Sequence, residues 1–275
     1  MTAREFLPGI FPDMPAPEYF SVPAMSASGA KKMLRSQAHY LESLNRPSDP
    51  TPNMIFGSAT HTGALEPWRF VDEVVAAPEL NLRTKAGKES RELFNQEHAG
   101  KIILSPDDHA RCVNTIAAVR RHPAAAKLLD GATIEQSLFW LDAKFGVPCK
   151  ARWDAWNHGI IVDFKTCQDA SPEAFGRSCA TYSYDVQAAQ YISAAEHVLN
   201  ESPRAFCFIA VETEPPHAVA VYAAQSDMIL AGRHRMDIAL ERYREIRETG
   251  TYRGYADLIQ PLKFPKWATR FDIGE

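Results

Sequence analysis

The sequence lacks the features that would place the protein in or across a membrane. It has no apolar run that approaches the ~20 residues needed to span a bilayer. Its beginning lacks a basic segment followed by an apolar core, so no secretory signal is visible. Internal repeats and low-complexity segments are also missing, which excludes a repeat protein. We therefore expect a cytoplasmic globular protein.

Cysteine is scarce, and its positions form no recognisable pattern. None of the cysteines forms a Cys-x-x-Cys pair, so the sequence indicates neither a zinc site nor an iron–sulfur cluster. An odd and scattered set is typical of reduced thiols that pack in a cytosolic protein. The five residues are Cys112, Cys149, Cys167, Cys179 and Cys207.

Positive charge is not in excess. The chain has 30 Lys and Arg against 34 Asp and Glu, which gives a net charge of −4. Because nucleic-acid-binding domains are usually basic, this balance argues against a broad binding surface. It does not exclude an enzyme whose acidic residues gather at a metal site while basic residues line a channel. Local basic clusters are present at Lys31, Lys32, Arg35 and His39, and at Lys263, Lys266 and Arg270.

Length and composition are those of an ordinary globular protein. At 275 residues, with 45% hydrophobic and 23% charged residues, the chain can bury a full core. We divide it into a Pro-rich extended arm at 1–25, a single domain at 26–249 with a β core at about 132–224, and a C-terminal tail at 250–275.

Hydrophobic periodicity and capping residues predict the order of the elements. Helices are predicted from Ser26 or Ser28 through an apolar stripe to Leu41, and at 57–65, 105–122, 123–129, 185–199 and 226–248, with another beginning at 171. Residues 83–101 are predicted to be a mobile loop with a helical piece. Strands are predicted at 133–141, within 150–166 as a pair, and at 205–211 and 218–223. This order predicts an α/β (α+β) fold, a mixed central sheet flanked by helices with a helical N-terminal part.

The stretch 150–166 predicts a β-hairpin with chemical groups on one face. Residues 158–159 are His-Gly, a pair that favours a tight turn and lies between two apolar runs. A two-residue loop there places Asp154 opposite Asp163, with Cβ atoms roughly 5 Å apart. Lys165 falls on the same face as Asp163, because side chains alternate along a strand.

Two facing carboxylates repel each other, and neither is buried favourably without a partner. A divalent cation removes this conflict, and Mg²⁺ keeps several waters that a phosphate can replace. Lys165 could then orient or deprotonate an attacking water and stabilise charge on the phosphate. The pattern indicates metal-assisted phosphodiester hydrolysis. The alternative is a surface hairpin with a salt bridge, since Asp-x-Lys alone is common.

Further residues outside the hairpin could contribute to such a site. Gln187 and Tyr191 share a helix face with Tyr184 and could contact phosphate, water or base, or they could form the polar side of an amphipathic helix. His61 stands among small residues, where it could pack or serve as a metal ligand. Glu135 begins a strand and is either solvent-facing or a third carboxylate near the metal.

Together these motifs resemble the PD-(D/E)xK nuclease superfamily, and within it the RecE-type exonuclease (exonuclease VIII) family of phage-derived recombination systems. The motif Gln187-x-x-x-Tyr191 also resembles that of RecB-like nucleases. The matching pieces are specific in this order, although each is common alone: Met25-Ser26-Ala27-Ser28-Gly29, Gly57-x-x-x-His61, Glu135-x-Ser137-x-Phe139-Trp140, Arg152-x-Asp154, Asp163-x-Lys165-Thr166 and Gln187-x-x-x-Tyr191.

The resemblance implies a restriction-endonuclease-like core and a Mg²⁺-dependent 5′→3′ exonuclease. Such an enzyme degrades one strand of linear duplex DNA and leaves 3′ tails for strand annealing. One or two ions would bind, with Mn²⁺ able to substitute. The implied metal ligands are His61, Asp154, Asp163 and the carbonyl of Phe164. The implied catalytic set is Asp154, Asp163, Lys165, Glu135, Gln187 and Tyr191.

The resemblance also implies a ring of three or four subunits and a single-strand annealing partner of the RecT/Bet type. The chain departs from related families in two respects. It lacks the cysteine quartet of the iron–sulfur RecB-like nucleases, and it lacks the long N-terminal extension of the largest RecE proteins.

An exonuclease that begins at a 5′ end needs a group that holds the terminal phosphate. The start of the first helix is the best candidate, because free N–H groups and the helix dipole favour an anion there. The predicted phosphate-binding residues are Ser26, Ser28, Lys31, Lys32 and Arg152, whose guanidinium can donate two hydrogen bonds. One serine could instead merely cap the helix.

Two alternatives to a duplex exonuclease stay open. One is a RecB-like nuclease that acts on single strands or flaps. The other is a DNA-end-binding module with a vestigial nuclease site. The presence of Asp154, Asp163 and Lys165 together argues against a vestigial site, because decayed sites usually lose one such residue.

Overall fold

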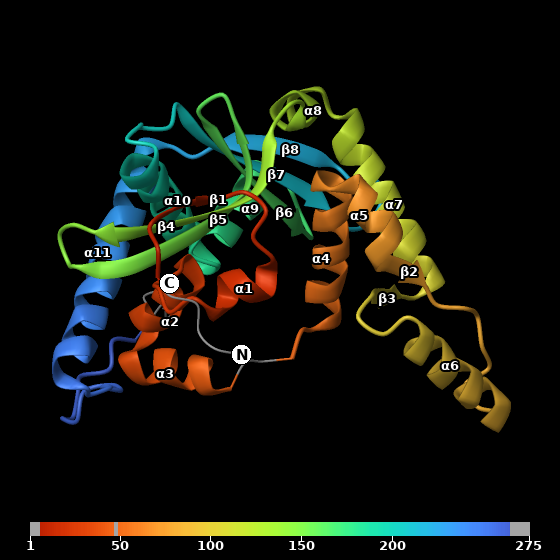
Figure 1. The fold of residues 1–275 in the computed structure, drawn as a ribbon, viewed down its shortest axis with the longest axis horizontal. Helices are drawn as coiled ribbons and strands as arrows, with labels where there is room; N and C mark the ends of the chain where they lie inside the picture. The colour runs from red at the N-terminus through yellow and green to blue at the C-terminus, as the bar shows by residue number, and fades with distance from the viewer. Residues whose placement is uncertain (1–5, 47–48, 265–275) are drawn as a thin grey trace, which may run out of the picture.

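The computed structural model describes residues 6–46 and 49–264. Its centre is a mixed six-stranded sheet in which only β6 and β7 run parallel (Figure 1). This arrangement confirms the predicted fold class. The strands, in their order across the sheet, are β1 (Gly9–Phe11), β4 (Thr133–Asp142), β5 (Val147–Asn157), β6 (Ile160–Cys167), β7 (Ala205–Glu212) and β8 (Val219–Ala223).

Helices cover both faces of the sheet because its central strands are apolar on both sides. On one face, Ile161 and Phe208 contribute to the larger core with buried residues of the helices. On the other face, Val162 and Phe164 contribute to a second core. The first face carries α2 (Ala27–Arg35), α3 (Gln37–Asn45), α9 (Pro172–Thr181), α10 (Tyr184–Val198) and α11 (Ser226–Thr249), and the second carries α4 (Pro52–Leu65), α7 (Pro106–Arg121) and α8 (Pro123–Leu129).

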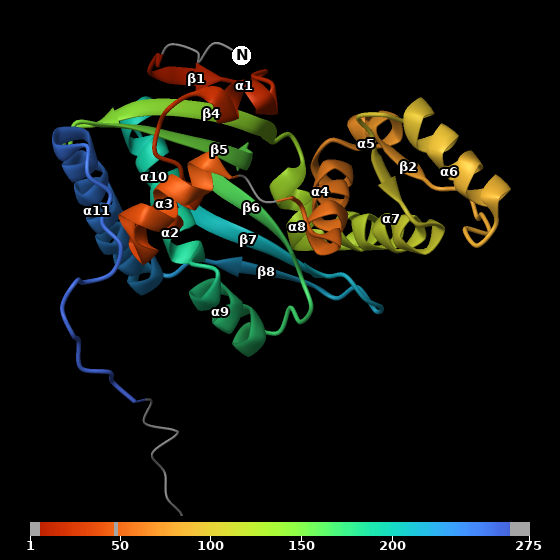
Figure 2. The ribbon, with the colours of Figure 1, turned by 90° about the horizontal axis from the view of Figure 1, so that it is seen from below.

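A smaller lobe extends to one side of the sheet (Figure 2). It contains α5 (Pro67–Glu73), the parallel strands β2 (Val74–Ala76) and β3 (Ile102–Leu104), and α6 (Lys85–Glu97). The sequence predicted only the helical piece of this lobe. Within the described residues, none of the helices is both long and apolar enough to cross a membrane.

The predicted basic helix is two helices, not one. Ser36 has an extended backbone (φ −172°, ψ 162°) that ends α2, and its side chain accepts a hydrogen bond from the N–H of His39 to begin α3. Serine is a preferred N-cap because its hydroxyl satisfies a free N–H of the first turn. The apolar stripe continues across this break, which is why periodicity alone predicted a single helix.

The N-terminal segment has more structure than an extended arm. Strand β1 pairs with β4, and helix α1 (Ala16–Ser21) lies against the sheet edge. Lys150 on β5 anchors this helix, because its Nζ donates to the carbonyls of Tyr19 (3.0 Å), Phe20 (3.2 Å) and Val22 (2.7 Å). A basic side chain at a helix C-terminus satisfies carbonyls that have no partner within the helix.

Replacing Lys150 with methionine is expected to lower the free energy of unfolding by about 2–3 kcal/mol, because the three backbone carbonyls of the N-terminal segment lose their charged hydrogen-bond donor. Urea unfolding at pH 7 measures the effect, because burial lowers the pKa of Lys150 only to about 8 and the ammonium is charged there. Lys88→Met on α6 is the matched control, as Lys88 is exposed. Equal unfolding free energies for both variants would contradict the anchor.

Helix α10 is held closely against α11. A Cβ at Gly232 would lie 2.0 Å from the carbonyl oxygen of Asp185, so only glycine permits this approach. Arg235 then pairs with the Asp185 carboxylate at 2.8 Å, and Arg233 pairs with Glu196 at 2.6 Å. These contacts fix the helix that presents Gln187 toward the sheet.

Candidate active site

The site begins where the β5–β6 hairpin opens. Both turn residues, His158 and Gly159, have left-handed backbones (φ 46° and 82°), as the His-Gly sequence predicted. Backbone pairing continues to Ala155–Val162 and stops there. Asp154 and Asp163 occupy the next position.

Beyond this point a side chain replaces the backbone hydrogen bonds between the two strands. Oδ2 of Asp154 accepts a hydrogen bond from the N–H of Phe164 at 2.7 Å. This bond ties the carboxylate of one strand to the backbone of the other. The two strands therefore hold Asp154 and Asp163 side by side at the point where the sheet opens.

Helix α4 brings His61 to these strands. A Cβ at Gly57 would lie 3.3 Å from Oγ1 of Thr166 on β6, so the glycine allows the helix to approach closely. One turn later, His61 lies between two carboxylates. Its Nε2 is 3.2 Å from Oδ2 of Asp154, and its Nδ1 is 3.6 Å from Oε1 of Glu135. The Gly-x-x-x-His spacing thus places the imidazole in the site.

Glu135 reaches the site through an unusual backbone. Its φ of 55° is left-handed within strand β4, although Ile134 and Gln136 on either side keep regular pairing with β5. A left-handed non-glycine residue costs roughly 1–3 kcal/mol and is held only by its surroundings. An ion pair with Arg152 provides part of that support. Glu135 therefore points into the site and is not a solvent-facing strand residue.

His61, Glu135 and Asp154 form a donor set for a cation. One ligand atom from each lies within 4.8 Å of the others. All three side chains are partly buried, with exposed fractions of 28%, 18% and 13%. An imidazole with two carboxylates fits a divalent cation, because the neutral imidazole nitrogen and the carboxylate oxygens bind such ions and the carboxylates balance their charge.

Asp163 lies beside this set but is already engaged. It is fully buried, forms an ion pair with Lys165, and accepts a hydrogen bond from Nε2 of Gln187 to its Oδ1 at 2.7 Å. The same nitrogen lies 3.2 Å from the hydroxyl of Tyr191. The structure thus brings the predicted Asp163, Lys165, Gln187 and Tyr191 into one chain of contacts, with Lys165 at its end.

The pKa values of this pair follow from burial and mutual attraction. Burial raises the pKa of Asp163 to about 6, although the Lys165 ammonium acts to lower it. For Lys165, burial acts to lower the pKa, but the carboxylates of Asp163 and Asp154 outweigh burial and raise it. The lysine therefore carries its positive charge at neutral pH.

Charges in the donor set are also coupled. Burial acts to lower the pKa of His61, but Asp154 and Glu135 raise it overall. Burial acts to raise the pKa of Asp154, and the neighbouring His61 and Lys165 nevertheless hold it low. Burial and the Asp154 charge raise the pKa of Glu135. His61 and Glu135 thus hold protons more readily at the place where a cation would bind, and a bound cation would replace those protons.

A cavity of about 260 Å³ opens onto the site. It brings together four of the five predicted phosphate-binding residues, which are Ser26, Ser28, Lys31 and Arg152. Lys32 lies outside this cavity and lines a neighbouring one.

Three of these four already have hydrogen-bond partners, and the Oγ atoms of Ser26 and Ser28 lie 3.1 Å apart. Ser26 caps α2, because its Oγ accepts a hydrogen bond from the N–H of Gly29 at 3.1 Å. Arg152 pairs with Glu135 and donates to the Met14 carbonyl at 2.8 Å.

Sequence analysis missed two aromatic residues in this cavity, Tyr19 and Phe20 of α1. The adjacent aromatic pair within a Pro-rich segment was the available signal. Tyr184 has a clearer place than predicted. Its ring centroid lies 4.9 Å from Nζ of Lys165 and 5.3 Å from Nζ of Lys31, so one aromatic face supports both cations.

The fold and the site define a PD-(D/E)xK-type protein, with Asp154 as the first acidic residue and Asp163-x-Lys165 as the second part of the motif. Residues 26–263 match the family described as a PDDEXK-like domain of unknown function (DUF3799). The chain belongs to this family. The match supports the superfamily that the sequence resembles, whereas the RecE-type subfamily is not shown by it.

A solved structure shows a similar fold. A protein from Eubacterium rectale, provisionally named an exonuclease, aligns with a TM-score of 0.62 at 15% identity, over 92% of this chain and 96% of that chain. The structure of SSO0001 aligns with a TM-score of only 0.27 at 12% identity, over 77% of this chain and 85% of that chain. No curated protein matches the sequence.

Proposed function

We propose that the protein is a divalent-metal-dependent deoxyribonuclease that digests linear duplex DNA from the 5′ end. The observation that carries this proposal is the donor set His61, Glu135 and Asp154 beside the buried pair of Asp163 and Lys165. A surface hairpin with a salt bridge would not bury both charges next to three converging cation ligands.

Each residue has a role that follows from its contacts. His61, Glu135 and Asp154 would hold the cation, with Asp163 and the Phe164 carbonyl as further candidates. A cation held there would supply Lewis-acid activation of a water and of the scissile phosphate. Mg²⁺ is the proposed ion, with Mn²⁺ as a substitute.

Lys165 would orient the attacking water and stabilise charge on the phosphate, since its ammonium is held in place by Asp163 and by the Tyr184 ring. Gln187 positions Asp163, and Tyr191 lies against the same amide. The side chains of this chain thus hold the lysine at one fixed position.

The proposed polarity depends on the phosphate-binding residues of the cavity. Lys31 is the best placed of them, because it lines the cavity and rests on the Tyr184 ring. Ser28 adds a hydroxyl at the start of α2, where the helix dipole favours an anion. Burial lowers the pKa of Lys31 to about 8, so it is charged at neutral pH.

A role in recombination completes the proposal. The protein would form a closed ring of three or four subunits and would supply 3′ tails to a single-strand annealing protein of the RecT/Bet type. A ring would also explain how an acidic chain holds a polyanion, because converging basic faces focus the field in a channel. Light scattering at micromolar concentration tests the ring, and a monomer that digests processively would contradict it.

The deciding experiment incubates end-labelled linear duplex with the protein, in Mg²⁺ or in EDTA. We expect release of 5′ nucleotides from linear duplex only with metal, and no cutting of a covalently closed circle. Faster digestion of single strands or flaps than of duplex would instead indicate the RecB-like alternative. A gel shift without digestion would indicate an end-binding module.

A further inference from the structure

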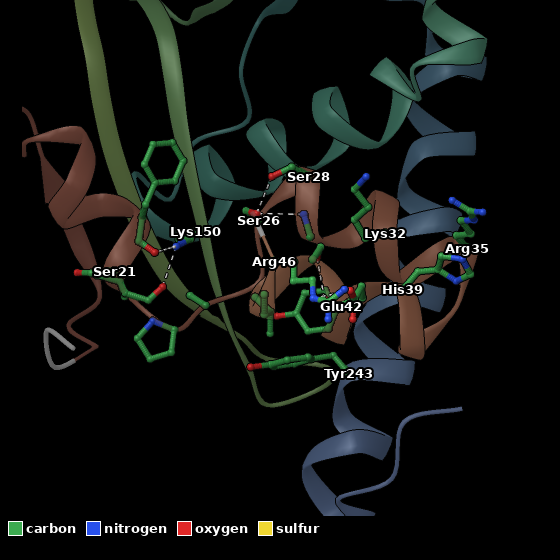
Figure 3. Close-up of a pocket in the computed structure, with 18 residues that line it drawn as sticks. Ser21, Ser26, Ser28, Lys32, Arg35, His39, Glu42, Arg46, Lys150 and Tyr243 are labelled. Carbon is green, nitrogen blue, oxygen red and sulfur yellow. Dashed lines mark hydrogen bonds and ion pairs between the residues drawn. The ribbon is translucent and has the colours of Figure 1, made fainter. Parts of the chain in front are cut away.

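A second, larger cavity of about 1070 Å³ adjoins the site (Figure 3). It lies between the end of α1 and the helices α2 and α3, on the first face of the sheet. Figure 3 shows Lys32, Arg35 and His39 along one side of it and the anchoring Lys150 on the other. We call it the basic cavity.

The charge of the basic cavity is opposite to that of the whole protein. Four cationic residues and His39 line it, against the single carboxylate of Glu42. Glu42 pairs with Arg46 at 3.5 Å, and Lys150 is occupied by backbone carbonyls. Among the described residues, Lys32 and Arg35 form no ion pair, so two exposed cations face this cavity in a chain of net charge −4.

The basic cavity adjoins the catalytic one. Phe20, Ser26 and Ser28 line both, so these three residues form the boundary between them. Glu135 and Asp154 lie on one side of this boundary, and Lys32 and Arg35 lie on the other. A linear polyanion could therefore pass from the cation ligands to the basic residues without leaving the surface.

Phe20 stands at this boundary as an exposed ring. Its exposed fraction is 71%, and its backbone carbonyl accepts a hydrogen bond from Lys150. Tyr19 contacts the ring from one side in an edge-to-face arrangement, with centroids 5.4 Å apart. An exposed aromatic ring at the boundary of the two cavities offers a face on which a base can stack.

We propose that the basic cavity binds a single-stranded DNA segment of two or more nucleotides that continues from the catalytic cavity. A base stacks on Phe20, and phosphates contact Lys32 and Arg35. The proposal rests on the proposed nuclease function for its substrate, but the binding itself needs no cleavage.

Single-stranded DNA fits this cavity better than other anions. A volume of about 1070 Å³ lies just above the roughly 300–1,000 Å³ that holds one drug-sized molecule, so the cavity has room for more than one nucleotide. The lining mixes cations with rings, namely Phe20, Tyr40 and Tyr243. That mixture suits a strand with accessible bases, because stacking adds to phosphate contacts, whereas a duplex hides its base faces.

The test measures binding in EDTA, so that cleavage plays no part. A 5′-phosphorylated hexathymidylate with a 3′ fluorescent label is titrated by anisotropy, and thymidine monophosphate competes. We expect the hexamer to bind at least about tenfold more tightly than the mononucleotide, because stacking and several phosphates contribute.

Variants then locate the binding. Phe20→Ala should weaken hexamer binding by roughly 5- to 100-fold, and Phe20→Trp should retain it. The double variant Lys32→Ala/Arg35→Ala should weaken binding and reduce the salt slope by about 1.4, or roughly 0.7 for each lost phosphate contact. Lys88→Ala/Lys101→Ala removes two exposed charges from the lobe and should change neither value.

The outcomes separate this proposal from the proposed function. Hexamer binding no tighter than mononucleotide binding, or no effect of Phe20→Ala, would overturn the basic cavity as a strand-binding site. Intact binding by a protein that digests no DNA in Mg²⁺ would overturn the nuclease function and leave the binding site standing. Digestion with unchanged affinity in the Lys32/Arg35 variant would overturn the binding site alone.

Discussion

Lys165→Met is expected to lower the rate of duplex digestion by at least ~10²-fold, the size of the effect of losing one positioned acid–base or charge-stabilising group. Methionine keeps the length of the side chain and its packing on Tyr184, but it removes the ammonium that would face the phosphate. The rate is measured on end-labelled linear duplex with saturating Mg²⁺. A variant that digests DNA at the rate of the native protein would refute the assignment of the site.

Folding must be controlled in this experiment, because Lys165→Met leaves Asp163 buried without its cation. The loss of folding stability is limited, because Asp163 can become protonated. Burial already raises the pKa of Asp163 to about 6, and loss of the ammonium raises that pKa further. At pH 7 the carboxyl can then be neutral and still accept the hydrogen bond from Gln187. Asp163→Asn makes the reverse change and leaves a buried lysine unpaired, so we expect it to be less stable than Lys165→Met.

His61→Ala is expected to raise the Mg²⁺ concentration needed for half-maximal activity by at least ~10-fold. Removing a hydrogen-bond partner of a metal ligand typically lowers metal affinity or activity 10–100-fold. Removing one of three ligands should lower the affinity by more than that. Mn²⁺ binding to the protein without DNA, measured by calorimetry, should weaken in parallel. His98→Ala on the lobe is the matched control. An unfolded variant whose residual activity keeps the normal Mg²⁺ dependence would identify His61 as a core residue.

Local signals in the sequence were sufficient for most of the central fold. The hairpin 150–166 follows from two-residue turn chemistry between alternating strands, and the observed register begins at Asn157–Ile160 as predicted. Helices with Ser-Pro starts were also predictable, because capping is a contact between residues close in the chain. Contacts between residues far apart in the chain were not predictable. The segment 1–25 gave no sign that Lys150 would anchor a helix there.

The site shows the same division. Asp154, Asp163 and Lys165 could be assigned from spacing along two adjacent strands. The role of Glu135 could not be assigned in this way, because strand propensity does not reveal a left-handed backbone that turns a carboxylate inward. Nor could the sequence show that Asp163 is engaged by Lys165 and Gln187, while His61, Glu135 and Asp154 converge as a donor set among the residues that the structure describes.

The backbone of Glu135 has a consequence for the evolution of this protein. A glycine at that position would adopt φ 55° without a backbone penalty of about 1 kcal/mol, although it would leave Arg152 without its ion pair. It would also remove one of the proposed cation ligands. If that ligand role holds, the glutamate keeps a strained backbone in exchange for a group that binds the cation, and selection on backbone strain alone would remove it.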